Sequence, residues 1–173
     1  MQEPTSLGET KSYLLLATIV LTAALLAAAL ATRSIALLFP RCYGLHAALC
    51  APIMAGSTLL ALRRTHHGAP VVASLGIMAL LLGAMRPLRM GFPFFVAALC
   101  ALVATAAFSK RPHFAPIAVA GSCSIGLYPA TLAGGLLSHS LYLSDETILV
   151  AAFTATITTA ACLLVIVLLT ESR

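Results

Sequence analysis

Four arginines flank two short connections between long apolar runs: Arg33 and Arg41 around the first, Arg86 and Arg89 around the second. The guanidinium group is a planar fork that suits carboxylate or phosphate oxygens. If the two connections meet at one mouth, the four side chains would favour a small anionic molecule. Each arginine could instead extend to lipid headgroups.

Other side chains near the same expected surface could contact a bound organic molecule. His46 lies about one turn into the following apolar run, where an imidazole could face a cavity or pack in the core. Phe94 could stack on a flat ring or serve as interfacial packing. A third connection on that side carries His139 and Tyr142. The candidate substrate-binding residues are therefore Arg41, His46, Arg86, Arg89, Phe94, His139 and Tyr142.

The elements that position these residues follow from composition. Apolar residues make up 61% of the 173 residues and charged residues only 9%, against roughly a quarter charged in soluble domains. Charged residues leave six uncharged intervals of 20 to 33 residues, and a helix of about 20 residues crosses a bilayer core. We therefore predict one all-α membrane domain over 1–173, a bundle of six spans at 13–31, 43–62, 70–85, 91–109, 114–137 and 148–170.

The charged loops predict an orientation in the cell membrane. With both termini inside, the cytoplasmic side carries the pairs Arg63-Arg64 and Lys110-Arg111, as the positive-inside rule favours. The N-terminal residues lack the basic start of a signal peptide, so we expect the first helix to be retained. The fifth span is the least regular, because several prolines and glycines interrupt it.

The distribution of acids argues against several activities. Asp and Glu occur only at positions 3, 9, 145, 146 and 171, outside every expected span. Proton-coupled transporters and intramembrane metalloenzymes generally need a buried acid, and no P-loop for ATP is present. The five cysteines show no metal-binding spacing, so we expect them to be packing residues. We expect no catalysis, no metal or cofactor in this chain, and no nucleic-acid partner.

The first expected span carries alanines at AxxxA spacing. They fall into two rows, Ala23, Ala27 and Ala31 in one and Ala24 and Ala28 in the other. Small residues four apart allow a second helix to approach closely within a membrane. The stripe therefore predicts a close helix contact, either within the bundle or with another subunit.

With six spans, an AxxxA first helix and basic outer loops, the chain resembles the substrate-binding S component of an energy-coupling factor (ECF) transporter. The segments 38–44 and 51–56, followed by Arg63-Arg64, are similar to the second-helix region of such subunits. The resemblance implies capture of a vitamin or similar micronutrient from outside, and docking of the alanine face onto a transmembrane coupling subunit. Two cytoplasmic ATPases would use the ATP. The chain departs from several vitamin-binding members in having no tryptophan.

The sequence is also compatible with two other classes of function. A structural or assembly protein would use the alanine and glycine faces only to hold a larger complex together. An enzyme acting on lipid or prenyl substrates would need acids that the expected spans lack. A ligand-dependent rise in melting temperature would distinguish a binding subunit from a scaffold, because only a native-state ligand site stabilises the fold in this way.

Overall fold

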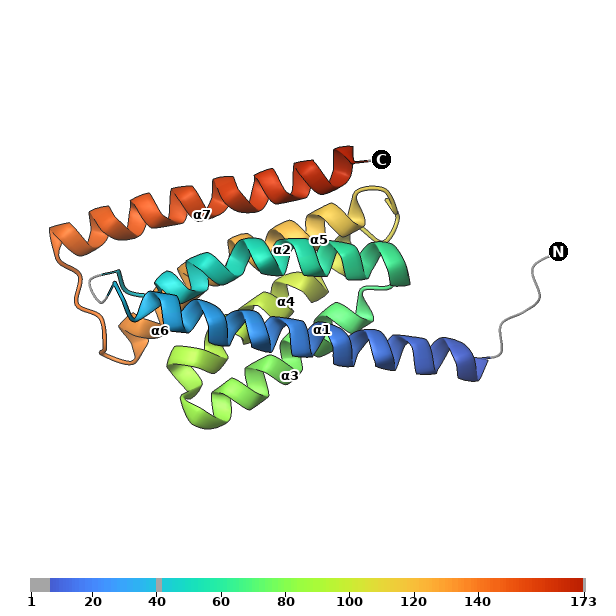
Figure 1. The fold of residues 1–173 in the computed structure, drawn as a ribbon, viewed down its shortest axis with the longest axis horizontal. Helices are drawn as coiled ribbons and strands as arrows, with labels where there is room; N and C mark the ends of the chain where they lie inside the picture. Colours follow the sequence, from blue (N-terminus) through green and yellow to red (C-terminus); the bar gives the residue numbers. More distant parts are fainter. Residues whose placement is uncertain (1–6, 40–41, 173) are drawn as a thin grey trace.

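A computed structural model describes residues 7–39 and 42–172. These residues form helices joined by short turns (Figure 1). The elements are α1 (Leu7–Ala36), α2 (Leu45–Thr65), α3 (Ala69–Met85), the π-helical turn η1 (Pro87–Gly91), α4 (Phe92–Ala107), α5 (Ala115–Ile125), α6 (Leu127–Leu137) and α7 (Asp145–Glu171).

Each predicted span corresponds to a helix or a pair of helices, and five of these segments are long and apolar enough to cross a membrane. The exception is α3, with 17 residues, or about 25 Å of helix. The first and last helices extend beyond the predicted 13–31 and 148–170, and α1 projects past the other helices at its N-terminal end (Figure 1). The start of α1 and the end of α7 lie at the same end of the bundle.

The predicted fifth span, 114–137, is broken into α5 and α6 at Gly126. Pro129 explains the break, because proline has no N–H for the carbonyl of Ile125 and its ring crowds that carbonyl. Together the two segments still give a 23-residue candidate crossing.

Two helix starts have residues that favour helix initiation. Ser144 caps α7, with its side chain accepting a hydrogen bond from the Thr147 N–H at 3.3 Å. Asp145 and Glu146 occupy the first turn, where acidic side chains complement the helix dipole. Pro70 lies in the first turn of α3, where its missing N–H costs little.

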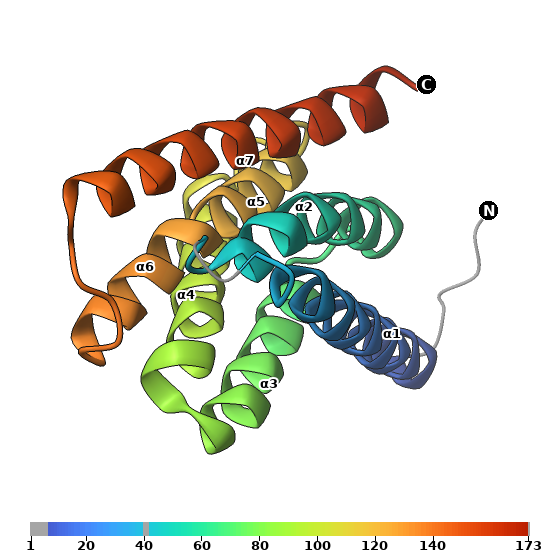
Figure 2. The same cartoon turned by 60° about the vertical axis from the view of Figure 1, so that its left-hand side comes forward.

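Five segments close into a ring around the core. In order, α1 packs on α2, α2 on α5, α5 on α4, α4 on α3, and α3 back on α1. Figure 2 shows α7 outside this ring, lying along α2 and α5. Leu25, Met54, Leu75, Met78 and Ala101 are fully buried inside the ring.

The outer faces of the bundle are apolar. Large hydrophobic side chains are exposed along α1 and α7, including Leu15, Ile19, Phe153, Leu164 and Leu168. A soluble protein rarely exposes such continuous apolar faces, so the fold is that of a multi-pass membrane protein.

Hydroxyl side chains return to their own helices. In α7, the hydroxyls of Thr154, Thr156 and Thr158 donate to carbonyls one turn earlier at 2.7–2.9 Å. In α5, Ser122 and Ser124 likewise donate to carbonyls within the helix. These hydroxyls therefore bond locally, within their own helices.

Candidate functional site

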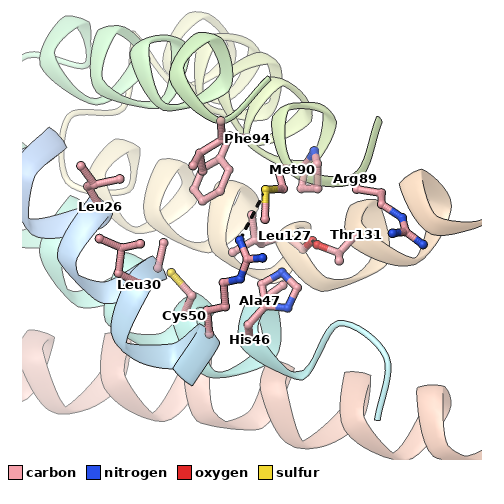
Figure 3. Close-up of a pocket in the computed structure, with 14 residues that line it drawn as sticks. Leu26, Leu30, His46, Ala47, Cys50, Arg89, Met90, Phe94, Leu127 and Thr131 are labelled. Atoms are coloured by element: carbon pink, nitrogen blue, oxygen red, sulfur yellow. Dashed lines mark hydrogen bonds between the residues drawn. The ribbon is translucent and has the colours of Figure 1, made fainter. Parts of the chain in front are cut away.

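A small internal cavity opens at the end of the bundle where α1, α3 and α6 end. Its volume is about 50 Å³, and Figure 3 shows the residues around it. Side chains from all of these helices and from α2 and α4 contribute. The lining residues are Leu26, Ala29, Leu30, Arg33, His46, Ala47, Cys50, Leu82, Arg89, Met90, Pro93, Phe94, Leu127 and Thr131.

A wider outer cavity of about 260 Å³ adjoins this inner cavity and shares Arg33, His46, Arg89 and Met90 with it. Arg86, Phe39, Cys42 and Tyr43 are among its further lining residues. The two cavities together are called the arginine cavity below. No acidic residue lines either part among the described residues, so the cationic side chains have no counter-charge in the cavity wall. A concave site of one charge sign attracts ligands of the opposite sign.

Arg33 enters the cavity from the last turn of α1. Its Nη1 lies 3.8 Å from the Sδ of Met90, the contact drawn as a dashed line in Figure 3. A thioether sulfur is a weak acceptor, so this contact orients the guanidinium while satisfying little of its donor capacity. The side chain is held toward the cavity and keeps donors for an anion.

His46 reaches the cavity because α2 begins abruptly. Gly44 precedes the helix with φ +73°, a left-handed conformation that favours glycine. A Cβ there would lie 3.2 Å from Cγ2 of Thr131 and 3.3 Å from the Tyr128 ring. The missing side chain therefore lets the start of α2 press against α6, which places His46 two residues later beside the opening.

The π-helical turn η1 positions Arg89. Its amide groups at Met90 and Gly91 both donate to the carbonyl of Arg86, at 2.9 and 3.4 Å. A Cβ on Gly91 would lie 2.6 Å from Cα of Gly83, so α3 and η1 touch backbone to backbone. π-turns inside helices often mark functional sites. Arg89 lines both parts of the arginine cavity and points away from His46 in Figure 3.

The floor of the inner cavity is apolar. Phe94 is 7% exposed and Leu127 is 1% exposed, and both face the space together with Cys50 and Leu26 (Figure 3). Thr131 adds a methyl group, since its hydroxyl donates to the Leu127 carbonyl at 2.9 Å. The cavity therefore combines an apolar depth with a cationic opening.

The predicted binding residues separate into two groups. His46, Arg86, Arg89 and Phe94 all line the arginine cavity. His139 and Tyr142 line neither part and are exposed in the connection from α6 to α7, Tyr142 at 81%. Arg41 lies outside the described residues.

Apart from Phe94, the residues of the apolar floor, such as Leu26, Cys50 and Leu127, were not predicted from the sequence. Leu26, Leu30 and Arg33 of α1 recur at helical spacing, as do His46 and Cys50 of α2 and Leu127 and Thr131 of α6. That spacing predicts a shared helix face, but it does not tell which face meets a cavity.

The alanine stripe lies apart from the arginine cavity. Ala23, Ala27 and Ala31 are exposed on the outside of the bundle, and Ala24 is exposed beside them. Ala28 is 8% exposed and packs in the core. The available small-residue face is therefore one row of three alanines with Ala24 at its edge.

The described residues contain no group of three or more side chains arranged to hold a metal ion. Cys50, Cys123 and Cys162 are buried and reduced, as packing residues would be. No family model, no curated protein and no solved structure matches this chain.

Proposed function

We propose that this protein is a non-catalytic membrane subunit that captures a small organic anion in the arginine cavity. The observation that carries the proposal is that Arg33, His46 and Arg89 all line the arginine cavity above an apolar floor, and that none of the described residues in its wall is acidic. A ligand with a carboxylate or phosphate head and a compact apolar body would place its head against the arginines and its body on the apolar floor. A carboxylated vitamin or cofactor precursor is of this class.

We further propose that capture is one step of import by an ECF-type transporter in the cell membrane. The exposed row Ala23, Ala27 and Ala31 provides a close-approach face for a transmembrane coupling subunit. Two cytoplasmic ATPases would then supply the energy that this chain cannot. Support comes from the position of this row on the outside of the bundle, away from the arginine cavity.

A scaffold without a ligand is the alternative function. The exposed alanine face would be sufficient for a scaffold, because it can hold another membrane subunit without any ligand. The arginine cavity favours capture, because grouping several cations around a hollow costs free energy through charge repulsion, which a bound anion would offset.

The ligand site is tested by thermal unfolding of the detergent-purified protein with a panel of carboxylated and phosphorylated vitamins. At a concentration 100 times Kd, a ligand stabilises the native state by about 2.7 kcal/mol. We expect Arg33→Gln and Arg89→Gln each to weaken binding by about ten- to a hundredfold, the effect of losing one charge-assisted hydrogen bond.

Arg111→Gln is the matched control, since Arg111 is exposed beyond α4 and lines neither part of the cavity. It should bind as the unmodified protein does. A ligand whose affinity is unchanged in both cavity variants would exclude the arginine cavity as its site, and a panel without any stabilising anion would favour the scaffold.

The transporter assignment is tested by purifying the tagged protein from its native membrane and identifying its partners by mass spectrometry. Two related ATPases with a larger membrane subunit are the expected result. Their reproducible absence would remove the ECF assignment while leaving anion capture to stand on the unfolding data.

A further inference from the structure

A second concave site lies on the outside of the bundle between α1 and α2, at the end opposite the arginine cavity. It has a volume of about 380 Å³. It is hollow because small side chains, Ala17, Ala24, Ser57 and Ala61, line it between larger ones. The remaining lining residues are Tyr13, Leu16, Val20, Leu21, Leu60, Arg64 and Thr65. We call it the α1–α2 groove.

The dimensions of the groove match one leaflet of a bilayer. Along α1 it extends from Tyr13 to Ala24, which is about 16 Å at 1.5 Å per residue. The hydrocarbon core is about 30 Å thick, so the groove covers about half of it. Because α1 and α2 are packed side by side and run in opposite directions, Tyr13 and Arg64 lie at the same end of the groove.

The chemistry of the groove changes along its length. Leu16, Val20 and Leu60 are exposed apolar side chains in its deeper part. At its end, Arg64 belongs to the last turn of α2, where a spanning helix reaches the headgroups. Tyr13 is 48% exposed beside it, and tyrosine favours this depth.

The two neighbouring arginines have different roles. The Nη1 of Arg63 donates to the carbonyl of Leu169, and so joins α2 to the C-terminal end of α7. The side chain of Arg64 is exposed and makes no hydrogen bond or ion pair within the described part of the chain. Its guanidinium can therefore bind a phosphate outside the protein.

Two other outward grooves provide a contrast. One lies between α3 and α4 and the other between α2 and α7, with volumes of about 530 and 480 Å³. Among the residues that the structure describes, neither groove is lined by a charged side chain. An acyl chain could lie in any of the three grooves, but only a groove ending in a cation distinguishes anionic from zwitterionic lipids.

We propose that the α1–α2 groove binds one anionic phospholipid, with an acyl chain over Ala17, Ser57 and Ala61 and the phosphate headgroup on Arg64. The bound lipid would fill a hollow that the two helices leave between them. This inference is independent of anion capture in the arginine cavity.

The test compares phosphatidylglycerol with phosphatidylcholine of identical acyl chains, added to the delipidated, detergent-purified protein. Native mass spectrometry measures the occupancy of each lipid. One arginine at a membrane surface contributes about 1 kcal/mol, so we expect about a fivefold preference for phosphatidylglycerol. Arg64→Gln should reduce the preference to about one, while Arg111→Gln, at the same end of the bundle, should keep it. Ala61→Leu should lower the occupancy of both lipids by filling the groove.

Other outcomes would overturn the proposal. A preference that survives Arg64→Gln would place the anionic headgroup elsewhere, and its loss in Arg89→Gln would place it in the arginine cavity. Equal loss in Arg111→Gln would indicate a diffuse basic surface. Stabilisation by glycerol phosphate alone, to the same extent as by the lipid, would show a phosphate site without a role for the acyl chain. If Ala61→Leu fails to fold, the lipid preferences of the arginine variants still test the proposal.

Discussion

At the scale of single residues, the absence of a side chain matters as much as its presence. A Cβ on Gly134 would lie 2.2 Å from the Leu88 carbonyl oxygen, and one on Gly135 would lie 2.6 Å from the Tyr43 ring. These two glycines let α6 touch both η1 and the segment before α2. They therefore hold together the elements that present Arg89 and His46.

We predict that Gly134→Ala destabilises the protein by about 1–3 kcal/mol, the usual cost of overpacking. The new methyl group meets backbone at Leu88, next to Arg89, so anion affinity should fall as well. Gly76→Ala is the matched control, because its Cβ would meet nothing within 4 Å. Thermal unfolding in detergent measures both variants, and equal stability of the two would contradict this packing.

The sequence allowed part of the cavity to be predicted at this scale. His46, Arg86, Arg89 and Phe94 were identified because charged or aromatic residues near span ends are unusual enough to stand out. The apolar floor at Leu26, Cys50 and Leu127 was not identified, since apolar residues occur on every face of every span. Only tertiary packing decides which of them line a hollow.

At the scale of helices, uncharged intervals located the elements well because charge is expensive inside a bilayer. The break between α5 and α6 was predicted only as an irregularity. Pro129 explains it once the helix is seen, yet Pro52 lies within an unbroken α2. Neighbouring helices decide whether a proline interrupts a membrane helix, and the sequence does not give those neighbours.

The face of α1 supports a prediction about association. Replacing Ala27 by Leu adds bulk to the exposed row of alanines, so it should abolish copurification of a coupling subunit while leaving ligand-induced stabilisation unchanged. Ala152→Leu makes the same change at an exposed position of α7 and should leave association intact. Normal association of the Ala27 variant would show that this row faces only lipid.

At the scale of the whole molecule, the helices of the closed ring, α1, α2, α5, α4 and α3, leave the arginine cavity at one end of the bundle. The order of helices around the ring could not be predicted from the sequence, since apolar spans of similar composition can pack in many orders. The ring places the arginine cavity and the Arg63-Arg64 pair at opposite ends. Capture of a solute from outside the cell therefore requires that the end with the arginine cavity faces outward.

We predict six crossings with both termini in the cytoplasm, which requires the short helix α3 to span. The test uses a cysteine-free background with single cysteines at His67 or Leu88, before and after α3, and at the exposed Tyr142. A membrane-impermeant maleimide added to intact cells should label positions 88 and 142, and should label position 67 only after permeabilisation. Labelling of 67 and 88 from the same side would mean that α3 does not cross. The reverse pattern, with only 67 labelled in intact cells, would open the arginine cavity to the cytoplasm and exclude capture of an external solute.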